Sequence, residues 1–420
     1  MSEQEAPEAP QEPEESPGLA ARLALYQRAG GVVTPLVTTI FAFFAGGLVV
    51  LVISGKNPLG TYKDIFRGSG LNWLFPWNEA NGERCSIRDI AGAAAAQICP
   101  SALSLQQTLI QMTVLILTAI AVAFAFRCGL FNIGGQGQYI VGTLAAVQVG
   151  VWFDSMPALP HILLAIVAAT LAGALWAGIA GLLKATVGAH EVITTIMLNW
   201  IALWIGSYLV GIGGPLQDPA AGPVGVTSDV SEGAKLPVVW GPPTLQGLHA
   251  GLFIALGALA VYWVVLNRTT LGYEVRAVGF NPDAAGYGGI SVARSYFLAM
   301  AISGAFAGAA GAMDILGWQF KLDDTSVKTY SYIAFLGIAV ALLGRNTAVG
   351  IFFAALLFGA LKTGTSTRNL NPDVFKPELA GNLTEIIQGL VVLFVGAELL
   401  FLGLWQARRR IRLPVRKAST

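Results

Sequence analysis

An apolar part of the chain is interrupted by three amide side chains that alternate with glycines. Asn132, Gln136 and Gln138 stand with four glycines in the run RCGLFNIGGQGQ, residues 127–138. An amide both donates and accepts hydrogen bonds, so its chemistry is weak contact with a polar solute. In contact with lipid, this backbone would leave costly unsatisfied N–H and C=O groups. We therefore expect Phe131 and the three amides to line a solute pathway; close packing through small residues is the alternative, and it explains only the glycines.

A second group of polar side chains follows helical spacing in the run HEVITTIMLNW, residues 190–200. Glu191, Thr194, Thr195 and Asn199 stand at positions i, i+3, i+4 and i+8, which is one face of a helix. A polar face on an apolar span should point into a helix bundle rather than at lipid, so these four are also candidate pathway residues. Glu191 has a second interpretation, that of a first-turn acid that complements the helix dipole.

The stretch 267–295 is expected to be a long loop that holds one short helix. Asn281 is typical of an N-cap, with Pro282 at the first helical position and Asp283 next to it. Glycines end this helix within about two turns, and Ser291 then caps the next span. A capped helix in so long a connection suits a surface that a partner holds; a simple connector is the alternative.

A fourth interruption lies at 337–350, where a short apolar stretch, a charged turn at Arg345 and another short apolar stretch follow one another. Together with 127–138 it places glycine-interrupted segments in both halves of the chain. That arrangement is typical of transporters whose binding site lies between two repeats.

The amino-acid composition indicates the environment in which these segments fold. The chain has 420 residues, of which 12% are charged and 55% hydrophobic. Soluble proteins average about 25% charged residues, and a soluble fold could not bury so much apolar surface. Six acidic residues fall in the first 15 positions and six basic ones after position 407, so the middle is poorer still in charge. We predict an integral membrane protein; a net charge of +1 gives no argument for nucleic acid as a partner.

The predicted fold class is an all-α integral membrane protein of about ten transmembrane helices, some of them broken. A span needs about 20 mostly apolar residues. Arginines 408–410 directly after an apolar run place the C-terminus in the cytoplasm, and an even number of spans then places the N-terminus there too. The ten expected spans are 33–53, 108–127, 133–153, 162–183, 192–212, 249–266, 296–316, 332–344, 348–364 and 384–404.

The expected domain organisation is one transmembrane domain between two cytoplasmic tails. Residues 1–30 form an acidic, proline-rich disordered tail, and 406–420 form a basic one. The domain 31–405 has outer loops at 54–107 and 213–248 and the inner loop 267–295. Cys85 and Cys99 fall on the outer side, where a disulfide could persist, and the residues leave that pairing open.

Motifs that the chain lacks narrow its function. The three cysteines and three histidines make no metal-binding pattern, and no GxxxxGK[ST], HExxH or GxSxG motif occurs. We therefore expect neither a cofactor nor an enzyme. Carboxylates within spans are few, Asp314 and Glu398 near span ends among them, whereas a proton or sodium antiporter needs a relay of them. The remaining possibility is a helical membrane protein that forms a pore and has no ATP-hydrolysing motif of its own.

Four motifs, in order, resemble a known family. They are GLFNIGGQGQ, KATVGAHEVITTIMLNWIA, RAVGFNPDAAGYGGISVARSYFLAMAISGAFAGAAGA and GIAVALLGRNTAVGI. They resemble the membrane permease subunit of bacterial ABC importers, in the class that includes branched-chain amino acid and ribose permeases, and are most similar to its nucleoside-type branch. The resemblance covers about 33–404. Gln136 stands where that family usually has Glu, and His190 where it usually has Asn.

The resemblance implies a location, partners and a coupling surface. The protein would lie in the bacterial cell membrane, surrounded by lipid, and pair with a second permease subunit, expected to be a paralogue. Cytoplasmic ABC ATPase subunits would supply the energy, and an extracellular solute-binding lipoprotein would deliver a nucleoside. The segment 281–290 resembles the family's coupling helix, so the expected ATPase-coupling residues are Arg276, Asn281, Pro282, Asp283, Ala284, Ala285, Gly289 and Ile290.

Two alternatives stay open at this stage. The same machine could carry simple sugars or branched-chain amino acids, because a hydrogen-bonding pathway does not specify one solute. A protein of another class, a motor-independent channel or secondary carrier, would show flux through this chain alone.

Overall fold

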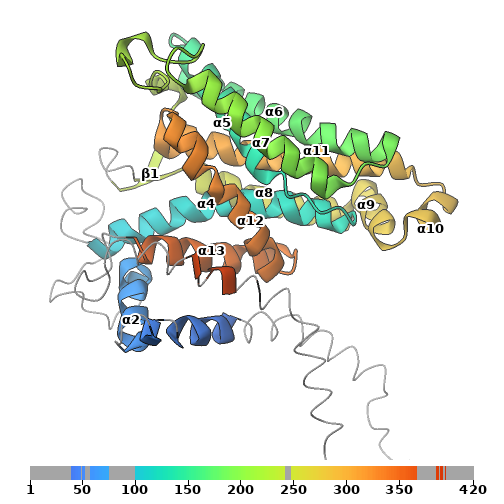
Figure 1. Ribbon diagram of the computed structural model, residues 1–420, viewed down its shortest axis with the longest axis horizontal. Coiled ribbons are helices and arrows are strands. Elements are labelled where there is room, and N and C mark those ends of the chain that lie inside the picture. Colours follow the sequence, from blue (N-terminus) through green and yellow to red (C-terminus); the bar gives the residue numbers. More distant parts are fainter. Residues whose placement is uncertain are drawn as a thin grey trace, which may run out of the picture.

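The structure is a computed structural model that describes residues 39–52 except 49, 57–74, 100–241, 247–366, 385–386, 388–390 and 393. The expected tails, the two outer cysteines and most of the span 384–404 lie outside the described residues. The described residues form a helical bundle whose long helices run roughly side by side along the longest axis (Figure 1). These helices are α4 Pro100–Arg127, α5 Gly135–Trp152, α6 Ala158–Val187, α7 Glu191–Val210, α8 Gly251–Arg268, α11 Val292–Asp314, α12 Tyr332–Leu343 and α13 Ala348–Gly364.

Six of the described helical segments are long and apolar enough to cross a membrane. They are Ser101–Arg127, Ala158–Val187, Glu191–Val210, Gly251–Arg268, Val292–Gln319 and Ser326–Leu343, and the shorter apolar helices are Thr39–Val52 and Ala348–Gly364. All six overlap expected spans. Helix α5 forms where the span 133–153 was predicted, but it is not among the six segments. The mainly helical membrane fold is confirmed, whereas a count of ten spans is not.

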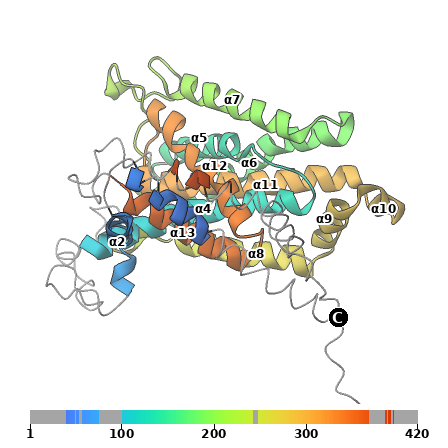
Figure 2. The same ribbon diagram turned by 60° about the horizontal axis from the view of Figure 1, so that its bottom comes forward.

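Helix α4 occupies the centre of the bundle. In its most apolar window, 83% of the residues are buried, against 28% in α6 and 22% in α7. A helix that is apolar all round is either enclosed by protein or faces lipid. Helix α4 is therefore enclosed by other helices, and α6 and α7 turn apolar side chains outward, with α7 along one edge of the bundle (Figure 2).

Small residues bring α6 and α11 into close contact. A Cβ atom on Gly304 would lie 2.2 Å from the carbonyl oxygen of Gly173, and one on Gly308 would lie 2.2 Å from that of Ala169. Only residues without a side chain fit at such a crossing. The glycines of α11 thus fix its position against α6.

One end of the bundle carries helix α9, Thr270–Phe280, and helix α10, Pro282–Tyr287. Helix α10 projects beyond the ends of the long helices, and α9 lies between it and the bundle (Figures 1 and 2). The short helix was predicted correctly: the Asn281 side chain accepts a hydrogen bond from Ala284 N at 3.0 Å, and Ser291 caps α11 by accepting from Arg294 N. Helix α9 occupies 11 residues of the stretch that was expected to be loop. We call this end the α10 end.

The opposite end is capped by an ordered polar segment. Strands β1 Val238–Trp240 and β2 Leu248–His249 pair antiparallel there, next to the short helices η3 Pro219–Ala221 and η4 Glu232–Ala234, with α2 Pro58–Gly68 and η1 Leu71–Leu74 nearby. Backbone bonds tie this cap to the chain after α11, from Thr227 N to Leu322 O at 2.9 Å and from Val230 N to Phe320 O at 2.7 Å. We call it the hairpin end.

Between α11 and α12 the helix is broken. Two π-helical turns, η6 Ile315–Gln319 and η7 Ser326–Tyr330, flank a short irregular stretch that begins at Phe320, whose φ is 58°. Such turns widen the helix and leave backbone groups that other residues must satisfy. The cap at the hairpin end satisfies several of them.

The turn between α12 and α13 lies near the α10 end and is held by two other helices. Arg345 and Asn346 both adopt left-handed backbone angles, with φ of 51° and 54°. The Asn346 carbonyl oxygen accepts hydrogen bonds from Arg127 Nη2 and from the Tyr262 hydroxyl, each at 2.7 Å. These two bonds stabilise a conformation that non-glycine residues rarely adopt.

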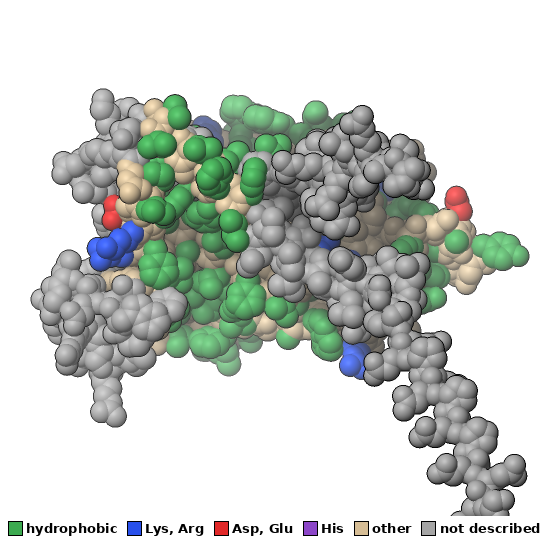
Figure 3. Space-filling view, turned by 90° about the horizontal axis from the view of Figure 1, so that it is seen from below, with side chains coloured by type: hydrophobic (Ala, Val, Ile, Leu, Met, Phe, Trp, Pro, Cys, Tyr) green, Lys and Arg blue, Asp and Glu red, His purple; other side chains and the backbone are tan. Residues whose placement is uncertain are grey.

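The surface is consistent with a protein that lives in a bilayer. On the face drawn in Figure 3, hydrophobic side chains dominate the middle of the described part, and the visible acidic side chains lie at its two ends. An apolar belt between polar ends is what a membrane-embedded bundle requires.

Candidate functional site

The amides of the first motif bond to one another and to α11. Asn132 Nδ2 donates to Ser303 Oγ at 2.7 Å and to Gln138 Oε1 at 3.0 Å, and Gln138 Nε2 donates back to Asn132 Oδ1 at 3.0 Å. Asn132 Oδ1 also accepts from Gly134 N at 2.8 Å. The side chains of Asn132 and Gln138 are almost fully buried. They therefore satisfy the irregular link between α4 and α5 and fasten it to α11.

Asn199, on α7, also forms hydrogen bonds with the backbone at the link between α4 and α5. Its Oδ1 accepts from Gly137 N at 2.8 Å, and its Nδ2 donates to Ile133 O at 2.9 Å. A Cβ atom on Gly137 would lie only 3.0 Å from the Asn199 Cα atom, so glycine allows the two helices to meet here. Asn199 faces the interior, as its helical spacing predicted.

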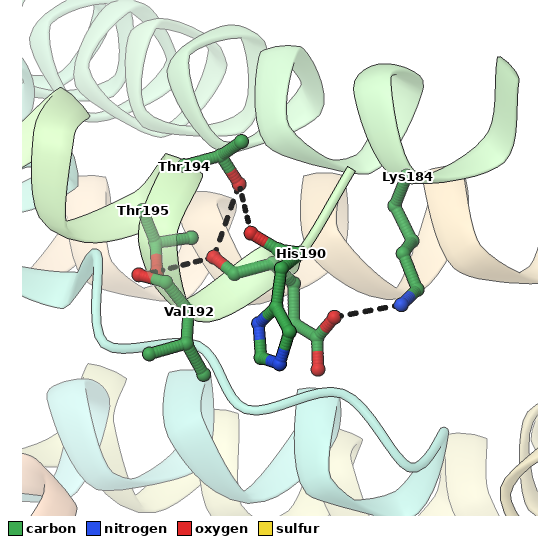
Figure 4. A network of polar contacts seen from close by, with 6 residues as sticks. Lys184, His190, Val192, Thr194 and Thr195 are labelled. Carbon is green, nitrogen blue, oxygen red and sulfur yellow. Dashed lines mark hydrogen bonds and ion pairs between the residues drawn. The ribbon is translucent and has the colours of Figure 1, made fainter. Parts of the chain in front are cut away.

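The other residues of the α7 face bond mainly to their own helix. Thr195 is fully buried, and its hydroxyl donates to Glu191 O at 2.7 Å, while that of Thr194 donates to the same oxygen at 3.0 Å. The Glu191 carboxylate pairs with Lys184 Nζ at 2.8 Å, which links the end of α6 to the start of α7 (Figure 4). Glu191 thus makes an ion pair at the helix start, which was not expected from the sequence.

Gln136 reaches a different neighbour. Its Nε2 donates to Ser331 Oγ at 3.0 Å, so it joins the first turn of α5 to the start of α12. Phe131 is half-buried and its ring packs against that of Phe126, with centroids 4.9 Å apart.

The structure therefore brings four of the eight predicted pathway residues to one meeting point of α5, α7, α11 and α12. We call Asn132, Gln136, Gln138, Asn199 and Ser303 the amide junction. Their hydrogen bonds cross four helices and carry no net charge. Neutral amide and hydroxyl groups can exchange these bonds for bonds to a neutral polar solute at low cost when the helices move.

At the α10 end, the predicted coupling residues divide into two groups. Asn281, Pro282, Asp283, Ala284 and Gly289 are exposed, whereas Ala285 is buried and Ile290 is half-buried. Arg276 is half-buried and its Nε donates to Gly272 O at 3.2 Å. Ala285 and Ile290 hold α10 on the bundle, and the exposed residues face outward.

Two aromatic side chains that the sequence reasoning missed stand at the ends of α10. Phe280 is 93% exposed and Tyr287 is 99% exposed. Exposed aromatic residues are unusual on a soluble surface and typical of interfaces. Their positions in the sequence could have identified them. Phe280 directly precedes the N-cap Asn281, and Tyr287 directly precedes the glycines that end the helix.

Helix α9 contacts the start of the link between α4 and α5, the segment that carries Asn132 of the amide junction. A Cβ atom on Gly279 would lie 2.3 Å from Arg127 O, and Gly129, with φ of 75°, lies directly against Gly279. Residues 127–129 are the start of the first motif and are followed directly by the segment that holds Asn132. Movement of α9 would therefore press on the link that carries Asn132.

A comparison with protein families matches residues 104–396 to the branched-chain amino acid transport system / permease component family. The match covers well over half of the chain. The chain belongs to this permease family. It is a multi-pass protein of the cell membrane, as its apolar helices require.

Curated relatives give a finer picture of the family. The permease is 38% identical over 377 residues to the guanosine ABC transporter permease protein NupP of Bacillus subtilis, covering 89% of this chain and 95% of the relative. It is 32% identical over 369 residues to the nucleoside ABC transporter permease protein NupB of Lactococcus lactis, covering 87% and 91%. It is 33% identical over 369 residues to the glucose ABC transporter permease protein TsgB13 of Haloferax volcanii, covering 86% of each. No solved structure matches the permease.

The permease also holds a buried carboxylate that the sequence reasoning left aside. Asp314, at the end of α11, is 5% exposed and accepts hydrogen bonds from the Tyr139 hydroxyl and from Gln319 Nε2. Tyr139 stands three residues after Gln136, on the same face of α5. Spacing alone could not show that Asp314 points inward, because a carboxylate at a span end is equally suited to the polar interface.

The described part of the permease offers no metal site. Within residues 39–366 that the structure describes, no three His, Cys, Asp or Glu side chains lie close enough to share an ion. The chemistry available to the amide junction is therefore hydrogen bonding.

Proposed function

We propose that this permease forms the solute pathway of an ATP-driven importer for nucleosides. The observation that carries the proposal is the amide junction, which places neutral donors and acceptors from four helices at the break between α4 and α5. Nucleosides are uncharged and rich in both donors and acceptors. A site of neutral amides matches such a solute without the cost of burying a charge.

In this proposal the α10 end faces the cytoplasm, with both chain termini on that side of a bundle of about ten spans. The basic residues 408–417 and Arg268, Arg276 and Arg294 support this orientation, because short cytoplasmic segments carry an excess of Lys and Arg. The cap at the hairpin end then faces outward, where a solute-binding lipoprotein would deliver its load.

A separate ATPase subunit drives the cycle by holding α10. The exposed Phe280 and Tyr287 fit the large, rigid anchors that dominate protein interfaces. Nucleotide-driven closure of two ATPases moves α9 and α10, and the contact of Gly279 with Arg127 passes that movement to the amide junction. A second permease subunit, a paralogue of this one, completes the pathway.

Sugar transport is the second candidate, and one observation favours it. The glucose permease TsgB13 is as similar in identity as the nucleoside permease NupB. Hydroxyl groups of a sugar would satisfy the same amides. The guanosine permease NupP, with higher identity over a larger share of both chains, supports the nucleoside.

The coupling part is tested with one pair of variants. Tyr287→Ala should abolish co-purification of the ATPase and ATP-dependent uptake, because it removes an exposed anchor from α10 while leaving the bundle intact. Tyr208→Ala is the matched control: Tyr208 is 71% exposed, but it lies near the opposite end of α7 from the α10 end. Retention of ATPase by Tyr287→Ala together with Phe280→Ala would reject α10 as the coupling surface.

A further inference from the structure

An apolar groove of about 330 Å³ lies between α8 and α13. The residues that line it carry no charge and, apart from one indole, no polar side-chain atom: Leu259, Ala260, Trp263, Ala348, Val349 and Phe352. Leu259 is buried, whereas Ala260, Trp263 and Val349 are exposed, so the groove is open to the outside of the bundle. A surface of this kind has nothing to offer water or a polar solute, and it suits a hydrocarbon chain.

One end of the groove lies at the level where α8 leaves the hydrocarbon. Helix α8 has 18 residues and is therefore about 27 Å long, close to the roughly 30 Å thickness of the hydrocarbon. Its last residue, Arg268, is thus expected among the lipid head groups. Trp263 lies one and a half turns earlier, about 7.5 Å deeper, which is the usual place of an interfacial tryptophan.

Arg268 is held beside this groove by a cation–π contact. Its guanidinium carbon lies 5.5 Å from the centre of the Trp263 ring. Among the described residues, Arg268 forms neither a hydrogen bond nor an ion pair. The N–H groups of the guanidinium are therefore available to an external acceptor, and their planar arrangement fits two oxygens of one phosphate.

A second arginine lies on the turn that leads into α13. Arg345 is exposed and adjoins Asn346, whose carbonyl oxygen accepts a hydrogen bond from the Tyr262 hydroxyl at 2.7 Å. Tyr262 directly precedes Trp263, so this bond holds the turn next to the groove. Helix α13 also begins there, and the positive end of its dipole adds to the charge of the two arginines. Positive charge thus gathers at the head-group end of an apolar groove.

We propose that this groove binds one anionic phospholipid of the surrounding bilayer. One acyl chain lies between α8 and α13, and the head-group phosphate accepts hydrogen bonds from Arg268, while Arg345 and the start of α13 add electrostatic attraction. A zwitterionic lipid gains less, because its own cation offsets the charge of its phosphate. The site does not depend on which solute the permease carries.

An apolar groove alone would equally suit a helix, either the segment 394–404 of this chain or a second permease subunit. The arginines favour the lipid over the segment. Glu398 is the only acidic residue of 394–404, and in a helical span it lies ten residues before Arg408, about 15 Å from the membrane surface. It would therefore lie well below the level of Arg268.

Quenching of Trp263 fluorescence by brominated lipids tests the site. The full-length permease is placed in nanodiscs of phosphatidylcholine that contain increasing fractions of brominated phosphatidylglycerol or brominated phosphatidylcholine. Subtracting the signal of Trp263→Phe isolates Trp263 from the rest of the 10 tryptophans. We expect half-maximal quenching at a fraction of phosphatidylglycerol at least about fivefold lower than that of phosphatidylcholine. Equal fractions would overturn the proposal, and so would the absence of quenching by either lipid, since protein would then cover the groove.

Variants separate the head group from the chain. Arg268→Gln together with Arg345→Gln should make the two lipids equal, and Ala260→Phe should do the same by filling the groove. Arg294→Gln is the matched control, because Arg294 is exposed at the same end of the bundle but does not line the groove; it should keep the preference. Retention of the preference by the double arginine variant would overturn the site.

A soluble anion distinguishes a lipid site from a phosphate site. Glycerol 3-phosphate carries the anionic group without the acyl chains, so an excess of it should leave the quenching by brominated phosphatidylglycerol unchanged. Competition by glycerol 3-phosphate at constant ionic strength would overturn the assignment to a lipid.

Discussion

Asn199 joins two helices through both ends of one amide. Its oxygen accepts from Gly137 N and its nitrogen donates to Ile133 O, so it replaces the helical hydrogen bonds that the break before α5 leaves unmade. In the hydrocarbon core of a membrane there is no water that could form hydrogen bonds with these backbone groups. The same logic applies to Asn132, which satisfies Gly134 N and reaches Ser303.

Replacing this amide should therefore cost stability as well as transport. Asn199→Leu keeps the branched shape of the side chain but leaves Gly137 N–H and Ile133 C=O unpaired, at about 1–3 kcal/mol for each buried group. We expect a clearly lower thermal unfolding temperature in detergent. Thr194→Val is the control, since the Thr194 hydroxyl bonds only to backbone carbonyls of its own helix start. Equal unfolding temperatures for the two variants would show that Asn199 is not structural.

His249 gives the permease a pH dependence of stability. It is buried at the hairpin end, where its Nδ1 accepts from Gly251 N at 3.1 Å, and burial lowers the pKa of His249 to about 4 from its usual 6.5. The neutral form is favoured by folding, so this stability is complete above pH 6.5 and is lost as the pH falls toward 4. The loss between pH 7 and pH 5 amounts to about 2 kcal/mol.

Unfolding temperatures measured at pH 7 and pH 5 test this prediction. His249→Gln keeps an acceptor for Gly251 N but does not titrate, so its unfolding temperature should fall less between the two pH values than that of the unmodified protein. The same fall in both proteins would assign the pH dependence to other groups.

At the scale of elements, the close crossing of α6 and α11 is the most demanding contact. Gly304→Ala would place a Cβ atom 2.2 Å from Gly173 O, which forces the two helices apart along their contact. We expect little folded protein on size-exclusion chromatography. Gly257→Ala, in the middle of α8, is the matched control, because a Cβ atom there meets nothing within 4 Å. It should be neutral or stabilising by up to about 1 kcal/mol; a well-folded Gly304→Ala would contradict the packing described here.

How far the elements could be predicted from sequence depended on the signal each one carries. The start of helix α10 was predicted to the residue, because Asn281 and Pro282 are local start signals, and the glycines that follow limited its length to about two turns. Helix α9 was expected to be loop, although Thr269 caps it by accepting from Gly272 N at 3.1 Å. Its short apolar pattern is satisfied by packing on α8, α11 and α4, which no local signal reports.

The candidate site was predictable in its residues but not in its connections. Glycines beside amides, and a polar stripe at helical spacing, were enough to select Asn132, Gln138 and Asn199. Their partners Ser303 and Ile133 come from segments far away in the sequence, so only the fold reveals them. The ion pair between Lys184 and Glu191 and the inward position of Asp314 depend likewise on how helices pack.

At the scale of the whole molecule, the permease is a bundle with two different ends and a polar seam between them. The α10 end carries the exposed aromatic side chains Phe280 and Tyr287, the hairpin end is closed by a hydrogen-bonded cap, and the amide junction lies between them. This arrangement suits alternating access, in which movement at one end changes contacts around a fixed central site. In the proposed function, the same arrangement would let a separate ATPase that holds α10 act on the amide junction.

Uptake of radiolabelled guanosine by liposomes tests the central claim most directly. Liposomes that hold the permease with its partner permease, ATPases and lipoprotein should accumulate guanosine only when ATP is present, and liposomes that hold this permease alone should accumulate none with or without ATP. Guanosine flux through the permease alone, without nucleotide or partners, would contradict the account and identify the protein as a motor-independent channel or carrier.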